Sequence, residues 1–385
     1  EVSPTQGSVQ IRLVADAAAL EERVVIGYGT VKRRDLTGSV ASVKAEEIVQ
    51  SPTHNAIEAI QGRVAGVDIT RATGAAGGGT NITIRGNKSI APRDELGERN
   101  APLYIIDGFQ GGDISTLNTN DIESIEVLKD AASAAIYGSR AANGVILVTT
   151  KRGKEGQAKV NFNSSLGMAQ LWKKPEFLNA EQFATLANEL YTNSNMTPIA
   201  EWANPASFGK GTNWIDQVFR NAPVQNYDFS ASGGTKKLKA AVSLGFLDQE
   251  GTMIETNYKR YTGRFTADLA ASDQLSFGGS LAYTITQSQG QQNQVMNYGI
   301  FNLAQQFYPT LGPDAVINGS SAYYTTQGDN PVLRARSMDN RLKNSRVFGN
   351  VFGAYEIIPG LKFRTSLGID NDNNRNTSWE PTAER

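Results

Sequence analysis

The sequence predicts an α+β domain followed by the first strands of a large antiparallel transmembrane β-barrel. From residue 160 onward, apolar and polar residues alternate with period two in one segment after another, as in strands with one apolar and one polar face. The connections between these segments alternate between very short and long, which is typical of outer-membrane barrels. The preceding α+β domain is indicated by short β-runs interleaved with short helical patterns.

The composition of the chain excludes several classes of protein. With 37 basic and 38 acidic residues among 385, it lacks the positive charge of a nucleic-acid-binding surface, so we expect no nucleic-acid partner. There is no cysteine and only one histidine, His54, which removes disulfides, thiolate nucleophiles, Cys/His zinc sites and Ser-His-Asp triads. We expect a surface or capping role for His54, and we predict no metal, no cofactor and no enzymatic activity.

Four regions differ in their sequence pattern. Residues 1–20 contain one alternating strand at 9–14, which indicates the end of an N-terminal β-domain extension. Residues 21–35 combine a short β-prone run with glycine and basic residues and are predicted to be an extended, mobile connector. The α+β domain is assigned to residues 36–153 and the partial barrel to residues 158–385. No signal peptide opens the sequence, so we expect Glu1 to lie inside a longer protein.

The α+β domain has two kinds of local pattern. Its β-runs are at residues 64–70, 81–85, 102–107, 122–128 and 144–151. Its short helices are expected at residues 55–61 and 131–137.

About seven segments carry the period-two pattern of the barrel. They lie near residues 160–171, 226–232, 237–247, 259–270, 274–286, 346–357 and 361–370. The short connections are at residues 233–236, 271–273 and 358–360, and the long ones at 173–225 and 287–345. A soluble β-sandwich also alternates, but its loops have no reason to be long at one end only. Seven strands are too few to close around a domain of this size, so we expect further strands beyond Arg385.

Several sequence blocks resemble one known family. Residues 24–30 (VVIGYGT), followed by residues 35–40 (DLTGSV), closely resemble the opening signature of the SusC/RagA family of TonB-linked outer-membrane proteins. Further blocks fit the family in the same order: AIQGRVAGV at 59–67, ITIRG at 82–86, PLYIIDG at 102–108, IESIEVLKD at 122–130 and AAIYGSRAANGVI at 134–146. The resemblance is continuous from about residue 20 to residue 153 and weaker beyond it.

The resemblance implies a plug domain inside a barrel of about 22 strands. It also implies location in the outer membrane of a Gram-negative, Bacteroidota-like cell, in contact with outer-membrane lipid, and active import of a nutrient. The implied partners are a SusD-like surface lipoprotein acting as a lid, and TonB with its ExbB/ExbD motor. We expect an oligosaccharide as cargo, with a peptide as the main alternative. Residues 1–20 would be the end of the family's carboxypeptidase-regulatory-like extension.

The connector contains the predicted TonB-binding segment. Its residues are Val24, Val25, Ile26, Gly27 and Tyr28. A short β-prone run of this kind can add as a strand to the edge of a partner's sheet, where main-chain hydrogen bonds supply the affinity. The alternative interpretation is an ordinary edge strand.

The loop between the β-runs at 81–85 and 102–107 is the candidate substrate-binding loop. Its candidate residues are Asn87, Lys88, Ser89, Arg93, Asp94, Glu95 and Arg99. So many charges are not tolerated in a domain core, and the family resemblance implies that this loop faces the external cavity. The alternative is a solvated loop without a ligand.

Four further residues are assigned structural roles inside the plug: Arg85, Gly86, Asp107 and Arg140. We expect both arginines to be ion-pair or hydrogen-bond partners there.

Two other motifs are interpreted as structural. The glycine-rich run at 74–79 is followed by a β-run and not by a helix, so it is expected to be a flexible turn without a phosphate site. The acidic and amide run at 370–374 lacks the glycine and glutamate of a calcium loop and is expected to start a solvated loop.

The aromatic residues of the long connections are Trp172, Trp202, Trp214, Tyr308, Tyr323 and Tyr324. They fit glycan platforms, barrel girdles or a lid interface, and the sequence does not choose among these. A non-transporting barrel or adhesin is the alternative from another class, but it has no need of a plug or a TonB-binding segment. A soluble glycan hydrolase would need paired carboxylates, which no pattern brings together.

Overall fold

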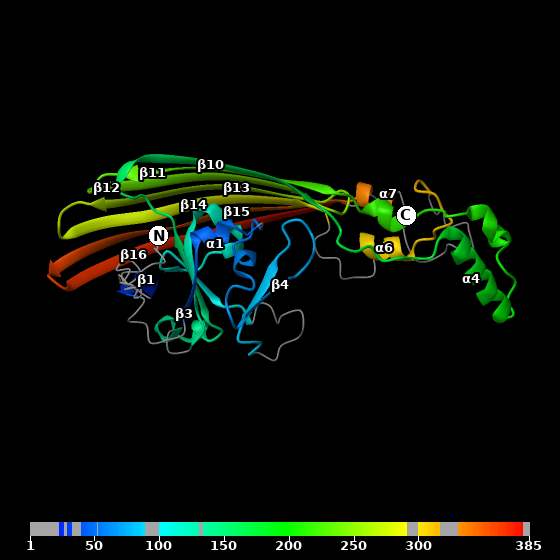
Figure 1. Cartoon of the computed structure of the whole chain (residues 1–385), viewed down its shortest axis with the longest axis horizontal. Helices are drawn as coiled ribbons and strands as arrows, with labels where there is room; N and C mark the ends of the chain where they lie inside the picture. Colours follow the sequence, from blue (N-terminus) through cyan, green and yellow to red (C-terminus); the bar gives the residue numbers. More distant parts are fainter. Residues whose placement is uncertain are drawn as a thin grey trace, which may run out of the picture.

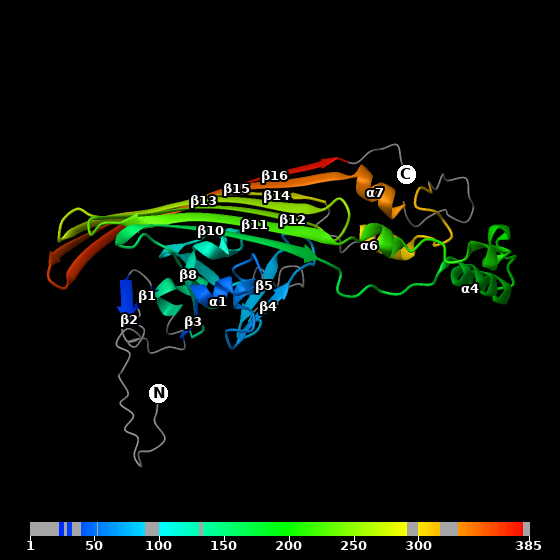
Figure 2. The same ribbon diagram turned by 45° about the horizontal axis from the view of Figure 1, so that its top comes forward.

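The computed structural model describes residues 23–26, 29–32, 40–51, 53–88, 100–130, 134–290, 299–315 and 330–379. It contains a curved seven-stranded sheet, an α+β domain under one face of that sheet, and a group of helices beyond one end of the strands (Figures 1 and 2). No described helix is both long and apolar enough to cross a membrane.

The seven-stranded sheet, here called the wall, is an antiparallel meander in which every strand pairs with its neighbours in the chain. Its strands are β10 (Gly156–Ala169), β11 (Ala222–Gly234), β12 (Leu238–Glu250), β13 (Asn257–Ala270), β14 (Leu275–Gln289), β15 (Asp339–Ile358) and β16 (Leu361–Trp379). All seven strands lie where the sequence predicts them, and most are longer. The expectation of a loop starting at Asp370 is wrong, because β16 continues to Trp379 in register with β15.

The wall has one apolar and one polar face, as the alternation predicts. On β13, Phe265 and Leu269 are exposed on the outward face, whereas Arg264 and Thr266 are buried on the face that meets the α+β domain. The alternation of apolar and polar residues ends near the end of β16, where successive residues from Asp370 to Ser378 are polar on both faces. That stretch therefore extends past the apolar band of the outward face, which explains why a period-two analysis ends the strand too early.

The α+β domain is built on a five-stranded sheet of order β3-β8-β9-β6-β7, with β6 and β9 parallel and the other pairs antiparallel. Its strands are β3 (Val40–Lys44), β6 (Leu103–Ile106), β7 (Phe109–Gln110), β8 (Ile122–Leu128) and β9 (Val145–Thr150). A separate hairpin pairs β4 (Val67–Arg71) with β5 (Thr80–Ile84). The sequence predicts β4, β5, β6, β8 and β9 and misses β3 and β7.

The helical elements of this domain are short. They are α1 (Ala45–Val49), η3 (Glu58–Ile60), η4 (Ile114–Thr116), η5 (Thr119–Asp121), η6 (Ala135–Tyr137) and η7 (Ser139–Ala141). The helix expected at 55–61 is reduced to the single 3₁₀ turn of η3.

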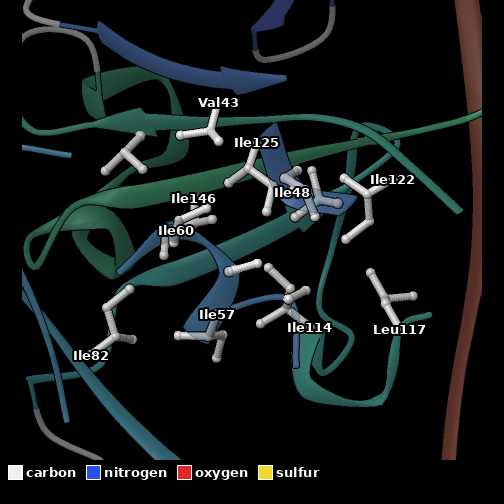
Figure 3. Packing of buried hydrophobic residues seen from close by; sticks show 14 of the residues in the cluster. Val43, Ile48, Ile57, Ile60, Ile82, Ile114, Leu117, Ile122, Ile125 and Ile146 are labelled. Carbon is white, nitrogen blue, oxygen red and sulfur yellow. The ribbon is translucent and has the colours of Figure 1, made fainter. Parts of the chain in front are cut away.

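An isoleucine-rich core holds the α+β domain together. Ile48 of α1, Ile60 of η3 and Ile125 of β8 are essentially inaccessible to solvent and pack in one cluster, as Figure 3 shows. Burying one such side chain contributes roughly 1.5–3 kcal/mol, so this cluster is a large apolar contribution to the stability of the α+β domain. One wall residue, Phe348 of β15, joins the cluster.

The long connections of the wall fold into small helical units with cores of their own. Their elements are α4 (Ala180–Asn193), η8 (Ala200–Trp202), η9 (Pro205–Phe208), α5 (Trp214–Val218), α6 (Ile300–Gln306) and α7 (Pro331–Ser337). Trp202 packs against Phe183 and Tyr308, with ring centroids 5.3 Å and 6.0 Å away. Trp214 packs edge-on against Phe307 at 4.8 Å. Trp202, Trp214 and Tyr308 are therefore used in loop cores, whereas Trp172 is 95% exposed.

Candidate functional site

The predicted TonB-binding segment forms one strand of a small hairpin. β1 (Arg23–Ile26) pairs antiparallel with β2 (Gly29–Lys32) in a two-stranded sheet of its own. The backbone of β1 also comes close to β9 of the α+β domain. Gly27 and Tyr28 lie outside the described residues. Among the described strands, β1 pairs with β2 alone, so it keeps one unpaired edge.

The base of the candidate substrate-binding loop is tied to the α+β domain. Asn100, which is 2% exposed, accepts a hydrogen bond from the backbone N–H of Lys88 at 2.7 Å. The ammonium group of Lys88 donates to the carbonyl oxygen of Ala142 at 2.7 Å. Asn87 is exposed beside it. The remaining candidates, Ser89, Arg93, Asp94, Glu95 and Arg99, lie outside the described residues.

Arg85 and Gly86 form the turn that follows β5. Both have left-handed backbone conformations, with φ of 58° and 81°, and glycine suits this region best. The Arg85 guanidinium pairs with Asp130 at 2.5 Å while remaining half exposed. Arg140, in η7, is exposed, and no ion pair or hydrogen bond of its side chain is found within the described residues, so its structural role stays a prediction. A 3₁₀ turn at the surface directs this long cation to solvent.

Asp107 joins the α+β domain to the wall. It has a left-handed φ of 49° in the β6–β7 turn, and its side chain is 3% exposed. Its carboxylate accepts hydrogen bonds from the backbone N–H and the hydroxyl of Thr150, at 3.0 Å and 2.8 Å. Arg264 of β13, 6% exposed, pairs with the same carboxylate at 2.6 Å. A buried ion pair of this kind depends strongly on both partners, because either one alone leaves an uncompensated charge.

A second buried carboxylate approaches from the opposite side of the boundary. Asp228 of β11 is 4% exposed and accepts hydrogen bonds from three amide side chains. Asn120 and Asn226 donate to it at 2.6 Å and 2.5 Å, and Asn118 donates to its other oxygen. Two of these amides belong to the α+β domain, so hydrogen bonds to a charged acceptor attach that domain to β11.

The lone histidine lies at the same boundary. Arg260 of β13 donates to the backbone carbonyl oxygens of His54 and Ser115, at 3.0 Å and 3.1 Å. Burial, together with the positive charge of Arg260, lowers the pKa of His54, so its imidazole is neutral at pH 7. His54 is half-buried and not on the open surface.

β16 contributes a second wall carboxylate to this boundary, after Asp228. Asp370 accepts a hydrogen bond from the backbone N–H of Gly112 at 2.9 Å and pairs with Arg346 of β15 at 2.7 Å. The predicted loop start at this position is therefore a strand residue in contact with the α+β domain.

Cavities with polar linings lie along this boundary. One, of about 700 Å³, is lined by His54, Glu58, Asn120 and Arg260, among others. Another, of about 730 Å³, lies beside Asp121 and Lys151. Polar spaces of this size accommodate water between the domain and the wall. Among the described residues, no group of acidic and histidine side chains is arranged to hold a metal ion.

The wall residues of this boundary were not predicted from the sequence. Asp228, Arg260 and Arg264 occupy the polar positions of alternating strands, where the pattern predicts only a polar face. The sequence signal for these wall residues was their charge, because charged residues on the polar face become buried if a domain fills the interior of the barrel. Without the partner positions, the sequence does not say which charges pair.

The comparisons with known proteins agree with this architecture. The model of the TonB-dependent receptor plug domain matches residues 32–145. The chain is 34% identical to TonB-dependent receptor P3 of Formosa agariphila, over 98% of this chain and 37% of that protein. It is 33% identical to TonB-dependent receptor SusC of Bacteroides thetaiotaomicron, over 95% of this chain and 38% of that protein. The chain thus spans a little more than a third of the length of these relatives.

The chain is also similar in structure to solved outer-membrane transporters. The RagAB peptide importer in its open-open state matches with a TM-score of 0.72 and 27% identity, over 93% of this chain and 43% of that chain. The structure of the RagAB peptide transporter matches with a TM-score of 0.76 and 26% identity, over 89% and 42%. The ferric citrate transporter FecA, at 11% identity and a TM-score of 0.54, shares the fold.

A plug domain seated on the inner face of an antiparallel barrel wall defines the class of outer-membrane TonB-dependent receptors. Within that class, the chain is SusC/RagA-like and corresponds to the N-terminal part of such receptors, namely the plug and the first strands of the barrel. The predicted family, fold class and outer-membrane location are confirmed. From here the α+β domain is called the plug.

Proposed function

We propose that the complete protein imports an oligosaccharide across the outer membrane, with a peptide as the alternative cargo. In this proposal it acts with a SusD-like surface lipoprotein and is driven by TonB and the ExbB/ExbD motor. The chain acts as a transporter and not as an enzyme.

The polar boundary between plug and wall carries the proposal. The wall residues buried at this boundary are mainly polar or charged, and include Asn226, Asp228, Arg260, Arg264, Thr266 and Asn350. Interfaces between domains that move relative to one another are more polar than permanent ones. When the plug moves, water can replace the partners of these groups, whereas a large apolar surface would stay unsolvated. A plug held in this way can be displaced and can return.

The hairpin of β1 and β2 supplies the point of attachment. It precedes β3 in the chain, and β3 is an edge strand of the plug sheet. A partner strand that adds to β1 gains main-chain hydrogen bonds along its length and can transmit a pull to β3. The pull reaches the plug through the chain itself, so it does not depend on the cargo.

Cargo selection is proposed to lie in the external connections and in the loop that begins at Asn87. Structures similar to this chain are described as a peptide importer, which supports the alternative cargo. The exposed Trp172 offers an aromatic platform of the kind that sugars stack on, which supports an oligosaccharide as cargo. Polar groups at Asn87 and Lys88 suit either cargo.

Deletion of residues 24–28 in the full-length protein tests the mechanism. We expect uptake of labelled cargo to fall to the background level of a strain without the protein, while cargo binding to whole cells is unchanged. Deletion of residues 4–8, which removes the same number of residues upstream, is the matched control and should leave uptake intact. Normal uptake by the 24–28 deletion would refute the TonB-driven mechanism.

A second experiment separates the cargo classes. Cells carrying the complete protein and its lipoprotein are given isotopically labelled mixtures of oligosaccharides or of peptides, and the label inside the periplasm is measured. Uptake restricted to peptides would replace the oligosaccharide proposal by its alternative. Uptake of neither oligosaccharides nor peptides would refute both cargo proposals.

A further inference from the structure

The apolar band on the outward face of the wall ends before the strands reach the long connections. Exposed apolar side chains cover strands β13 to β16, including Phe265, Leu281, Val351 and Leu367. Tyr261 and Tyr283 lie at the end of this band that is nearer the long connections. Aromatic girdles mark the two edges of the lipid-facing band of outer-membrane barrels, and long connections are extracellular. The tyrosines therefore mark the outer-leaflet edge.

A row of polar and basic residues crosses four strands just beyond that edge. Lys259 of β13 is opposite Gln287 of β14, which is opposite Lys343 of β15, which is opposite Arg375 of β16. All four occupy outward positions, since they follow the same alternation as Tyr261. The row lies one alternation, or two residues, past Tyr261, at the level of the lipid headgroups.

Two cations of this row face one another without an anion between them. Lys259 is neutralised by Asp248 at 3.0 Å. Lys343 and Arg375 are exposed and directly opposite, and neither forms an ion pair with another described residue. Like charges directly opposite on a sheet are destabilising. The cost disappears when an anion lies between them, and two cations with a neighbouring amide are the donor set that phosphate prefers.

The same four strands carry an apolar groove of about 540 Å³ below the row. It is lined by Phe265, Ala267, Phe277, Gly279, Val351 and Leu367. The small residues make the groove: Ala267 and Gly279 are opposite one another, and a Cβ at Gly279 would lie 2.7 Å from the carbonyl oxygen of Asn350. The groove begins six residues along β13 from Lys259, or about 20 Å along the strand. An acyl chain whose headgroup lies at the cationic row reaches it.

We infer that Lys343 and Arg375, with Gln287, bind the phosphate of an outer-leaflet lipid, and that the groove beneath them receives one of its acyl chains. The lipid face of β13 to β16 is continuous with both features, which favours a membrane lipid over a free anion. The binding site lies on the outside of the barrel, so it is independent of cargo and of the plug.

The test uses the purified full-length protein in detergent. A phosphorylated disaccharide glycolipid, the same lipid after enzymatic dephosphorylation, and inorganic phosphate are titrated separately, and binding is measured by native mass spectrometry. The double substitution Lys343→Gln and Arg375→Gln is compared with Lys236→Gln and Lys237→Gln, which removes the same charge from a short turn at the opposite end of the strands. Ala267→Leu fills the groove without changing charge.

We expect the first pair of substitutions to weaken binding of the phosphorylated lipid roughly 30-fold, at about 1 kcal/mol per basic residue near an anionic lipid surface. The control pair should change it less than twofold, and Ala267→Leu should weaken it several-fold. Equal binding of the phosphorylated and dephosphorylated lipids, or wild-type binding by the Lys343 and Arg375 double variant, would overturn the inference. Binding of inorganic phosphate as tightly as the lipid would also overturn it, in favour of a free-anion site.

Discussion

The plug is held together by apolar contacts in its interior and is attached to the wall by polar contacts at its boundary. Its interior is an apolar cluster built around Ile48, Ile60 and Ile125 (Figure 3). Its boundary with the wall depends on the Asp107–Arg264 pair and on amides around Asp228. Of the wall residues that the structure describes, Phe348 alone joins the apolar cluster of the plug.

The difference separates folding from attachment. Apolar burial stabilises the plug mainly through its own residues, because Phe348 is the single wall residue among the described members of its core cluster. Ion pairs and amide–carboxylate hydrogen bonds stabilise only the seated position, and in water their groups are solvated again. Substitutions in the core should therefore destabilise the plug itself, and substitutions at the boundary should release a plug that is still folded.

The largest effect is expected for Arg264→Met. Removing the guanidinium leaves the Asp107 carboxylate buried with Thr150 alone, which costs about 3–5 kcal/mol for a broken buried pair. In the full-length protein, hydrogen exchange should increase at the plug surface that faces β13. The amides of β8 and β9, inside the plug sheet, should stay protected.

The double variant Arg264→Met with Asp107→Asn is the control for this prediction. It removes both charges, and asparagine tolerates the left-handed backbone at position 107. Most of the lost protection should return. If the double variant exchanges as fast as Arg264→Met alone, the effect is not due to an unpaired charge.

Ile125→Ala tests the other side of the comparison. Ile125 has no solvent exposure in the plug core, so truncation leaves a cavity and costs about 3 kcal/mol. Exchange should rise throughout β3, β8 and β9. Ile136→Ala removes an isoleucine that is half exposed and should cost less than about 1 kcal/mol. Local exchange confined to the β11 and β13 boundary in Ile125→Ala would contradict the separation of folding from attachment.

Asp228→Asn should have a smaller effect at the boundary. It keeps the shape of the side chain but replaces a charged acceptor of three amides by a group with one acceptor oxygen, which costs about 2 kcal/mol. The seated population, measured by cross-linking between plug and wall, should fall while plug unfolding is unchanged. Ser230→Ala, on the same face of β11, is the control.

The two contacts also differ in how well the sequence predicts them. Alternation locates all seven wall strands, and β-runs locate most of the plug sheet, because these patterns report which side of an element is buried. β3 was missed because VASVK has too few large apolar residues to stand out, and its place is set by pairing with β8. The helices at α5 and α6 were missed because tertiary packing of Trp214 on Phe307 decides them.

Long-range pairs explain why the boundary escaped prediction. Asp107 and Arg264 are separated by 157 residues, so no local pattern connects them. The sequence singled out Asp107 through its motif, but its partner follows only from the register of β13 against the plug. Membership of a motif does not by itself predict burial, because Arg140 also lies in a motif and is exposed in the fold.

The smallest effect is a pH dependence at the boundary through Asp121. Burial of its carboxyl raises the pKa of Asp121 above the ordinary value of 3.8, although a hydrogen bond from Ser243 and the charge of Arg264 act in the other direction. The seated protein therefore holds this proton more tightly than the unfolded chain does. The contribution of Asp121 to stability is fully present below pH 3.8 and is lost as the pH rises through the raised pKa. Asp121→Asn should be more stable than the wild type above that window and should show a flatter pH profile in thermal unfolding of the full-length protein. If the two profiles are parallel from pH 4 to pH 8, the carboxyl is not buried at the boundary in the assembled barrel.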